Sequence, residues 1–97
     1  MDYADVLQTA RTNTKKAEDS AEFFEQIAKN EEVKVKIARV KLAEAKTEKE
    51  RANAKIEIAF AERKVANTKY KAAEAKLRAA EYKVEAADIE MELVEEE

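Results

Sequence analysis

Apolar side chains recur at alternating intervals of three and four residues through most of this chain. The most regular row holds eight alanines spaced seven residues apart, from Ala38 to Ala87. A second row, rich in large apolar residues, stands three residues before each alanine. This alternation is a heptad repeat, in which one stripe of an α-helix faces another helix. It predicts an all-α fold: one long amphipathic helix, straight or bent, in a coiled-coil or helical-bundle assembly.

We call this stripe seam 1 and label its two rows a (large residues) and d (alanines). The residues that we expect to form an assembly contact along it are Val35, Ala38, Leu42, Ala45, Ala52, Ile56, Ala59, Ala66, Tyr70, Ala73, Leu77, Ala80, Val84 and Ala87.

A second apolar stripe lies roughly opposite the first, at heptad positions c and f. Its larger members, which we call seam 2, are Phe23, Val33, Ile37, Val40, Ile58, Val65, Tyr82, Ile89 and Leu93. A two-stranded coiled coil fills these positions with charge, whereas a helix that is apolar on two sides is buried on two sides. The sequence therefore predicts two interfaces. The alternative, that these are scattered surface residues, is normal for single apolar side chains.

The chain contains neither glycine nor proline, and its heptad phase never slips. Both features favour one helical unit over residues 1–97, with a less regular segment at 1–30, a continuous heptad helix over 31–94 and an acidic tail at 95–97. Weaker helix formers allow a bend or short turn near 12–20 or 29–32. A competing interpretation is a helical hairpin that turns at 29–32, where Asn30 precedes a carboxylate at a core position.

The alanines of seam 1 favour antiparallel neighbours. In an antiparallel pair, a residues face d residues, so each layer would match a large side chain with alanine and bring the helices close together. A parallel pair would alternate crowded and thin layers and would place Lys49 and Arg63 against their own copies. Ion pairs at exposed flanking positions are too weak to decide between the two arrangements.

Charge is segregated along the chain. Residues 33–80 carry fourteen basic and six acidic side chains, a net charge of +8, whereas residues 1–32 carry −4 and residues 81–97 carry −7. Acidic ends and a basic middle favour staggered overlap of one chain's end on another's middle, an offset that builds open assemblies.

Reactive side chains are scarce. There is no histidine or cysteine, and Ser20, the only serine, has no histidine to activate it. We therefore expect no enzymatic activity, no catalytic residue, no cofactor and no metal site. Lysines interleaved with glutamates disfavour nucleic acid, and two apolar stripes disfavour a membrane surface. With no signal peptide or membrane span recognised, we expect a cytoplasmic or particle-associated protein.

These features point to a structural protein that self-assembles into a filament, tube or similar ordered multi-helix assembly, with other copies of the chain as partners. The alternative is a closed coiled-coil dimer or tetramer that acts as an adaptor or scaffold for a different protein. A designed or low-complexity helical sequence is a third interpretation.

Overall fold

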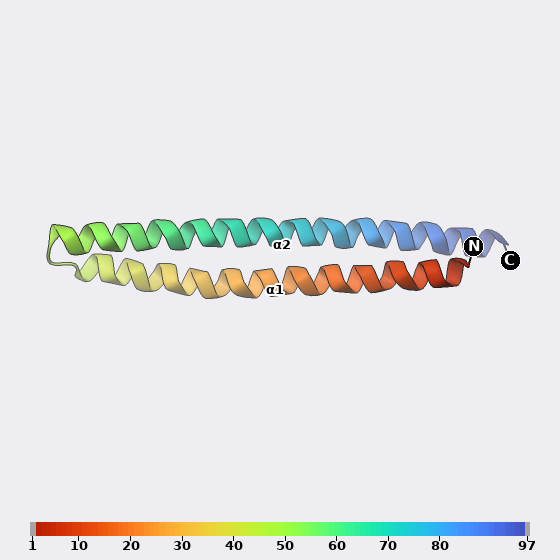
Figure 1. The fold of residues 1–97 in the computed structure, drawn as a ribbon, viewed down its shortest axis with the longest axis horizontal. Coiled ribbons are helices and arrows are strands. Elements are labelled where there is room, and N and C mark those ends of the chain that lie inside the picture. The colour runs from red at the N-terminus through yellow and green to blue at the C-terminus, as the bar shows by residue number, and fades with distance from the viewer. Residues whose placement is uncertain (1, 97) are drawn as a thin grey trace. The chain divides into compact units, whose positions relative to one another are not determined.

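The computed structural model describes residues 2–96, which form two helices, α1 (Tyr3–Glu44) and α2 (Glu48–Glu96), joined by residues 45–47 (Figure 1). No strand occurs within this range, and the two helices pack against each other. The predicted all-α fold with helix–helix packing is confirmed. Neither helix has a stretch that is long and apolar enough to cross a membrane, as far as residues 2–96 show.

The uninterrupted helix predicted over 31–94 is wrong, because the chain turns at residues 45–47. The alternative turn at 29–32 is wrong as well, since that segment lies inside α1, as does the weaker segment 12–20. Poor helix formers thus did not mark the break. A local capping motif at the start of α2 marks the turn instead.

Two hydrogen bonds that involve Glu50 stabilise the turn at the start of α2. The Thr47 hydroxyl accepts a hydrogen bond from the Glu50 N–H (3.1 Å), and the Glu50 carboxylate accepts one from the Lys46 N–H (2.8 Å). Thr-x-x-Glu is the sequence signature of a capping box, which satisfies N–H groups that have no partner within the helix. No residue in the described part of the chain has a positive φ, so this turn needs no glycine.

We expect Thr47→Ala to lower the free energy of unfolding by about 1 kcal/mol, because it removes the cap of α2. Urea denaturation followed by circular dichroism measures this change. Thr12→Ala is the matched control, since Thr12 is exposed within α1 and alanine favours helix there. Equal stability of Thr47→Ala and the control would show that the cap does not hold the turn.

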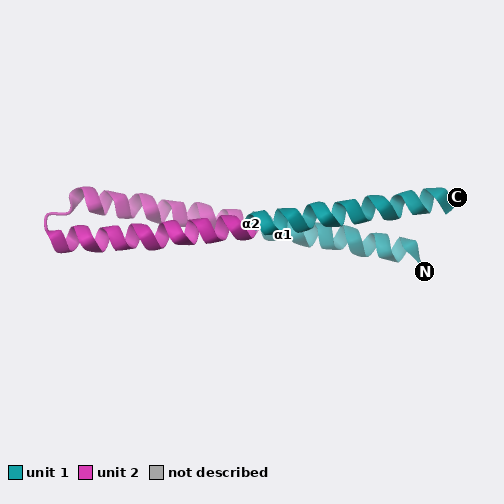
Figure 2. Ribbon diagram, turned by 90° about the horizontal axis from the view of Figure 1, so that it is seen from above, with its two compact units in different colours: residues 1–22, 72–97 teal, residues 23–71 magenta. Residues whose placement is uncertain are grey.

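The chain divides into two compact units, where the sequence predicted one (Figure 2). Unit 1 contains residues 1–22 and 72–97, and unit 2 contains residues 23–71. In unit 1, the first part of α1 lies antiparallel to the last part of α2 (Figure 2). A buried cluster of Leu7, Ala10, Ala86 and Ile89 joins them, with Tyr3, Val6 and Leu93 packed around it.

Unit 2 is a helical hairpin that contains the turn (Figure 2). Alanine and valine fill the contact between its two helical segments. The buried apolar residues are Ala28, Val35 and Ala38 on α1 and Ala54 and Ala61 on α2. Small side chains let the two helix axes approach closely. One carboxylate, Glu31, lies in the same row and is only 9% exposed, with the Lys34 ammonium 3.1 Å away.

Candidate assembly surfaces

Seam 1 is divided between the inside and the outside of the hairpin. On α1, Val35 and Ala38 are buried, and Leu42 is half-buried, as is Ala45 just after the helix. On α2, every member of the seam is exposed. These residues are Ala52, Ile56, Ala59, Ala66, Tyr70, Ala73, Leu77, Ala80, Val84 and Ala87.

Seam 2 is divided in the opposite sense. Its members on α2 are turned inward, with Ile89 buried and Ile58, Val65, Tyr82 and Leu93 half-buried. Its members on α1 are exposed, and these are Phe23, Val33, Ile37 and Val40. Each helix therefore uses a different seam for the contact within the chain: α1 uses seam 1 and α2 uses seam 2.

The distribution of charged side chains explains which seam each helix turns toward the other. On α2, the rows of seam 1 include Lys49 and Arg63, which are both exposed, whereas the c and f rows carry no charged residue between Ala54 and Leu93. On α1, the c and f rows include Asp5, Lys16, Asp19 and Glu44, whereas seam 1 includes only Glu31. Burying an unpaired charge is expensive. α1 therefore buries the stripe with one charge instead of four, and α2 buries the stripe whose two charges, Arg51 and Glu96, lie near the ends of the helix.

A ladder of ion pairs runs along one side of the α1–α2 contact. In unit 1, Arg11 pairs with Glu90 (2.6 Å) and Glu18 with Lys83 (3.0 Å). In unit 2, Glu32 pairs with Lys69 (2.9 Å) and Arg39 with Glu62 (3.0 Å). Within each unit, successive pairs are one heptad apart on both helices.

These ion pairs specify alignment more than they add stability. All of these side chains are about half exposed, and exposed pairs contribute about 0.2–1 kcal/mol each. A slip of one helix past the other would break the pairs of a unit together. The hydrogen bond and charge of Lys69 hold the pKa of Glu32 below its usual range.

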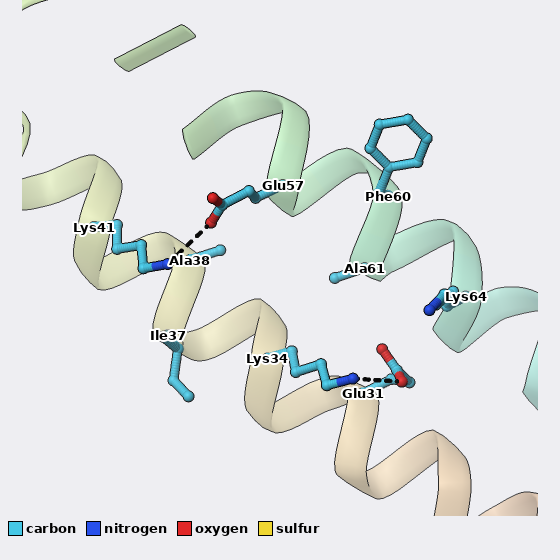
Figure 3. A pocket seen from close by; sticks show the side chains of 9 residues that line it. All are labelled: Glu31, Lys34, Ile37, Ala38, Lys41, Glu57, Phe60, Ala61 and Lys64. Atoms are coloured by element: carbon cyan, nitrogen blue, oxygen red, sulfur yellow. Dashed lines mark hydrogen bonds and ion pairs between the residues drawn. The ribbon is translucent and has the colours of Figure 1, made fainter. Parts of the chain in front are cut away.

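Figure 3 shows a groove of about 390 Å³ in unit 2, which is lined by residues of both α1 and α2. Ala38 of α1 and Ala61 of α2 point toward each other, whereas Ile37 points away from α2 and Phe60 points away from α1. Ion pairs Lys34–Glu31 and Lys41–Glu57 line the groove (Figure 3). Ile37 and Phe60 line the rim of this groove, but their side chains point away from the opposite helix, toward the outer sides of the hairpin.

The outer sides of the two units differ. In unit 2, the outer side of α1 exposes Phe23, Val33, Ile37 and Val40, and the outer side of α2 exposes Ile56, Phe60 and Tyr70. In unit 1, only α2 has an apolar outer side, formed by Leu77, Val84, Met91 and Val94. The corresponding c and f positions of α1 in unit 1 are polar, namely Asp5, Thr9, Thr12, Lys16 and Asp19. Unit 2 thus has two candidate contact surfaces and unit 1 has one.

Two features of these surfaces went beyond the sequence prediction. Phe60 was not assigned to either seam, because it stands at heptad position e beside the alanine row. The capping box at Thr47 was also not recognised, although its Thr-x-x-Glu spacing is visible in the sequence. Within residues 2–96, no three side chains of the metal-binding types His, Cys, Asp or Glu gather closely enough to form a metal site.

No protein-family model matches this chain, and neither curated proteins nor solved structures show a significant match to it.

Proposed function

We propose that this chain is a structural protein that self-assembles, through the outer sides of its two helices, into a filament, tube or similar ordered multi-helix assembly. The observation that carries this proposal is the pair of exposed apolar surfaces on unit 2. The side chains concerned keep 52–66% of their surface exposed, and burying a side chain of this size yields about 1.5–3 kcal/mol.

Two surfaces on opposite sides of a subunit support continued growth. Seams 1 and 2 are centred about 200° apart around a helix, given about 100° per residue. Because α1 turns seam 1 toward α2, its exposed seam 2 faces away from α2, and the converse holds for α2. In unit 2, a neighbouring copy can pack on either side without blocking the other, so contacts on the two sides together can link many copies.

A closed dimer or tetramer that serves as a scaffold is the second candidate. The polar outer side of α1 in unit 1 favours it, since that unit offers a single apolar surface. One apolar surface is satisfied by one neighbour, which ends growth there. The two candidates therefore differ in whether the apolar patch on α1 in unit 2 is also used.

Light scattering on the full chain, from micromolar to millimolar concentration, separates these candidates. We expect the average mass to rise continuously with concentration and negative-stain images to show ordered assemblies. One fixed small stoichiometry over the whole range would support the closed oligomer and contradict open growth. A monomer at all concentrations would contradict both.

A paired substitution tests the patch on α1. We expect Val33→Glu with Val40→Glu to stop growth at a small oligomer, because two carboxylates would have to be buried at each new contact. Thr9→Glu with Thr12→Glu adds the same charge to the polar outer side of α1 in unit 1 and should leave the mass unchanged. Growth of the Val33/Val40 variant like that of the control would show that this patch is not an interface.

A further inference from the structure

The residues on the outer side of α2 indicate which surface of a second copy packs against it. We infer that the α2 surface of unit 2 in one copy packs antiparallel on the α2 surface of unit 1 in a second copy of this chain, with Ala59 of one copy opposite Val84 of the other. This inference rests on the proposed self-assembly and specifies one of its contacts.

Size complementarity along the two surfaces supports this pairing. The α2 surface of unit 2 offers Ala52, Ala59 and Ala66, and the surface of unit 1 offers Met91, Val84 and Leu77, each spaced by one heptad. An antiparallel approach places each alanine opposite one of the large residues. Further along, Ile56 and Tyr70 of unit 2 meet Ala87 and Ala73 of the second copy in the same way. Small residues facing large ones fill each layer and bring the helices close together.

Of the two charged residues in this row, Lys49 meets Val94 at the end of the contact, and Arg63 lies nearer its middle. Arg63 of unit 2 faces Ala80 of the second copy, and Glu81 stands beside that alanine. The arginine therefore meets a small residue and a carboxylate instead of its own copy. A parallel pairing of two α2 surfaces would place Arg63 against Arg63.

The net charges of the two units also favour contact between unlike units. Residues 23–71 carry a net charge of +5, whereas the residues of unit 1 carry −8. Contact between unit 2 of one copy and unit 1 of another is therefore attractive on balance. Contact between like units would be repulsive, and complementary potentials of this kind guide orientation and speed association.

The side chains that flank the α2 surface specify the alignment. In this register, Glu62 of one copy approaches Lys83 of the other, and Lys55 approaches Glu90. Glu62 already pairs with Arg39, and Lys83 with Glu18. The new contact thus extends two ion pairs into a network of alternating charge across the interface. Between Lys55 and Glu90, the like charges that meet in this row are those of Lys69 and Lys76.

A slip of one heptad is less favourable in either direction. One slip places Lys69 against Lys83 and Glu62 against Glu90. The opposite slip places Lys55 against Lys83 and Lys69 against its own copy. Both slips keep alanine opposite large residues, so packing of the apolar row allows all three registers. The flanking charged residues therefore select one of them.

Disulfide formation tests the register directly, because the chain contains no cysteine. The test variant carries Ala59→Cys and Val84→Cys, and two control variants combine Ala59→Cys with either Leu77→Cys or Met91→Cys. These controls correspond to slips of one heptad. Residues 59 and 84 are about 37 Å apart along one helix at 1.5 Å per residue, so a disulfide between them must join two copies.

We expect the test variant to form the doubly linked dimer about tenfold faster than either control, because a disulfide requires its two Cα atoms to lie within about 7 Å. Peptide mapping should identify links between residues 59 and 84. Equal or faster linking in a control would overturn this register. If the unmodified chain still grows with concentration in light scattering, that result leaves the proposed self-assembly standing, whereas a purely monomeric chain would overturn both.

Discussion

Glutamate at both Leu77 and Val84 should abolish association through α2 while the hairpin stays folded. The two side chains keep 61% and 62% of their surface exposed in the single chain, so charging them removes little from the α1–α2 contact. In an assembly they would be buried, and each contributes about 1.5–3 kcal/mol by burial. Since each 1.4 kcal/mol is a factor of ten, losing both weakens association by about 100- to 10,000-fold.

Sedimentation velocity over a concentration series measures this loss, and circular dichroism reports whether the helices remain. The Thr9→Glu and Thr12→Glu variant again serves as the control, because it adds two carboxylates to the same unit on its polar side. Association of the Leu77/Val84 variant at the strength of this control would show that the exposed row on α2 is not a contact surface.

Leucine in place of Ala79 should destabilise the hairpin, whereas leucine in place of the neighbouring Ala80 should not. Ala79 is 5% exposed and faces α1, and Ala80 is exposed on the outer side of α2. Overfilling a close contact costs about 1–3 kcal/mol, whereas surface substitutions usually change stability by less than about 0.5 kcal/mol. Comparing the stabilities of the two variants therefore shows which of the two side chains points toward α1.

Urea denaturation at a concentration where the chain is monomeric measures both variants. The sequence alone placed Ala80 in the alanine row of seam 1 and Ala79 on the opposite face, so the two variants exchange roles if α2 presents its other side. Greater destabilisation by Ala80→Leu would show that seam 1 of α2 faces α1, contrary to the structure.

The heptad pattern was a sound guide to the helices and to both apolar stripes, because side chains that recur every three or four residues lie on one face of a helix. The pattern was misleading about continuity. An unbroken phase predicts an unbroken helix, yet Thr47 and Glu50 form a cap inside it. The cap leaves the heptad count unchanged, so periodicity gives no sign of the turn.

The assignment of stripes to neighbours could have been carried further from the sequence. Once a turn near residue 46 is known, counting charges shows that seam 1 of α2 would bury Lys49 and Arg63, and that the c and f rows of α1 would bury Asp19 and Glu44. Desolvation then favours the observed contact. Without the position of the turn, there was no basis for treating residues 1–44 and residues 48–96 separately.

The sequence by itself determined that the chain is helical and that each helix has two apolar faces, since these properties depend on local spacing and on residue type. Only the tertiary structure decided which face each helix presents to the other, and therefore which face remains for a second copy. On α2 both stripes satisfy the hydrophobic pattern about equally well, whereas on α1 the second stripe is apolar only between Phe23 and Val40. A three-residue turn and the avoidance of buried charge selected between them, and those constraints act only once two distant segments of the chain lie side by side.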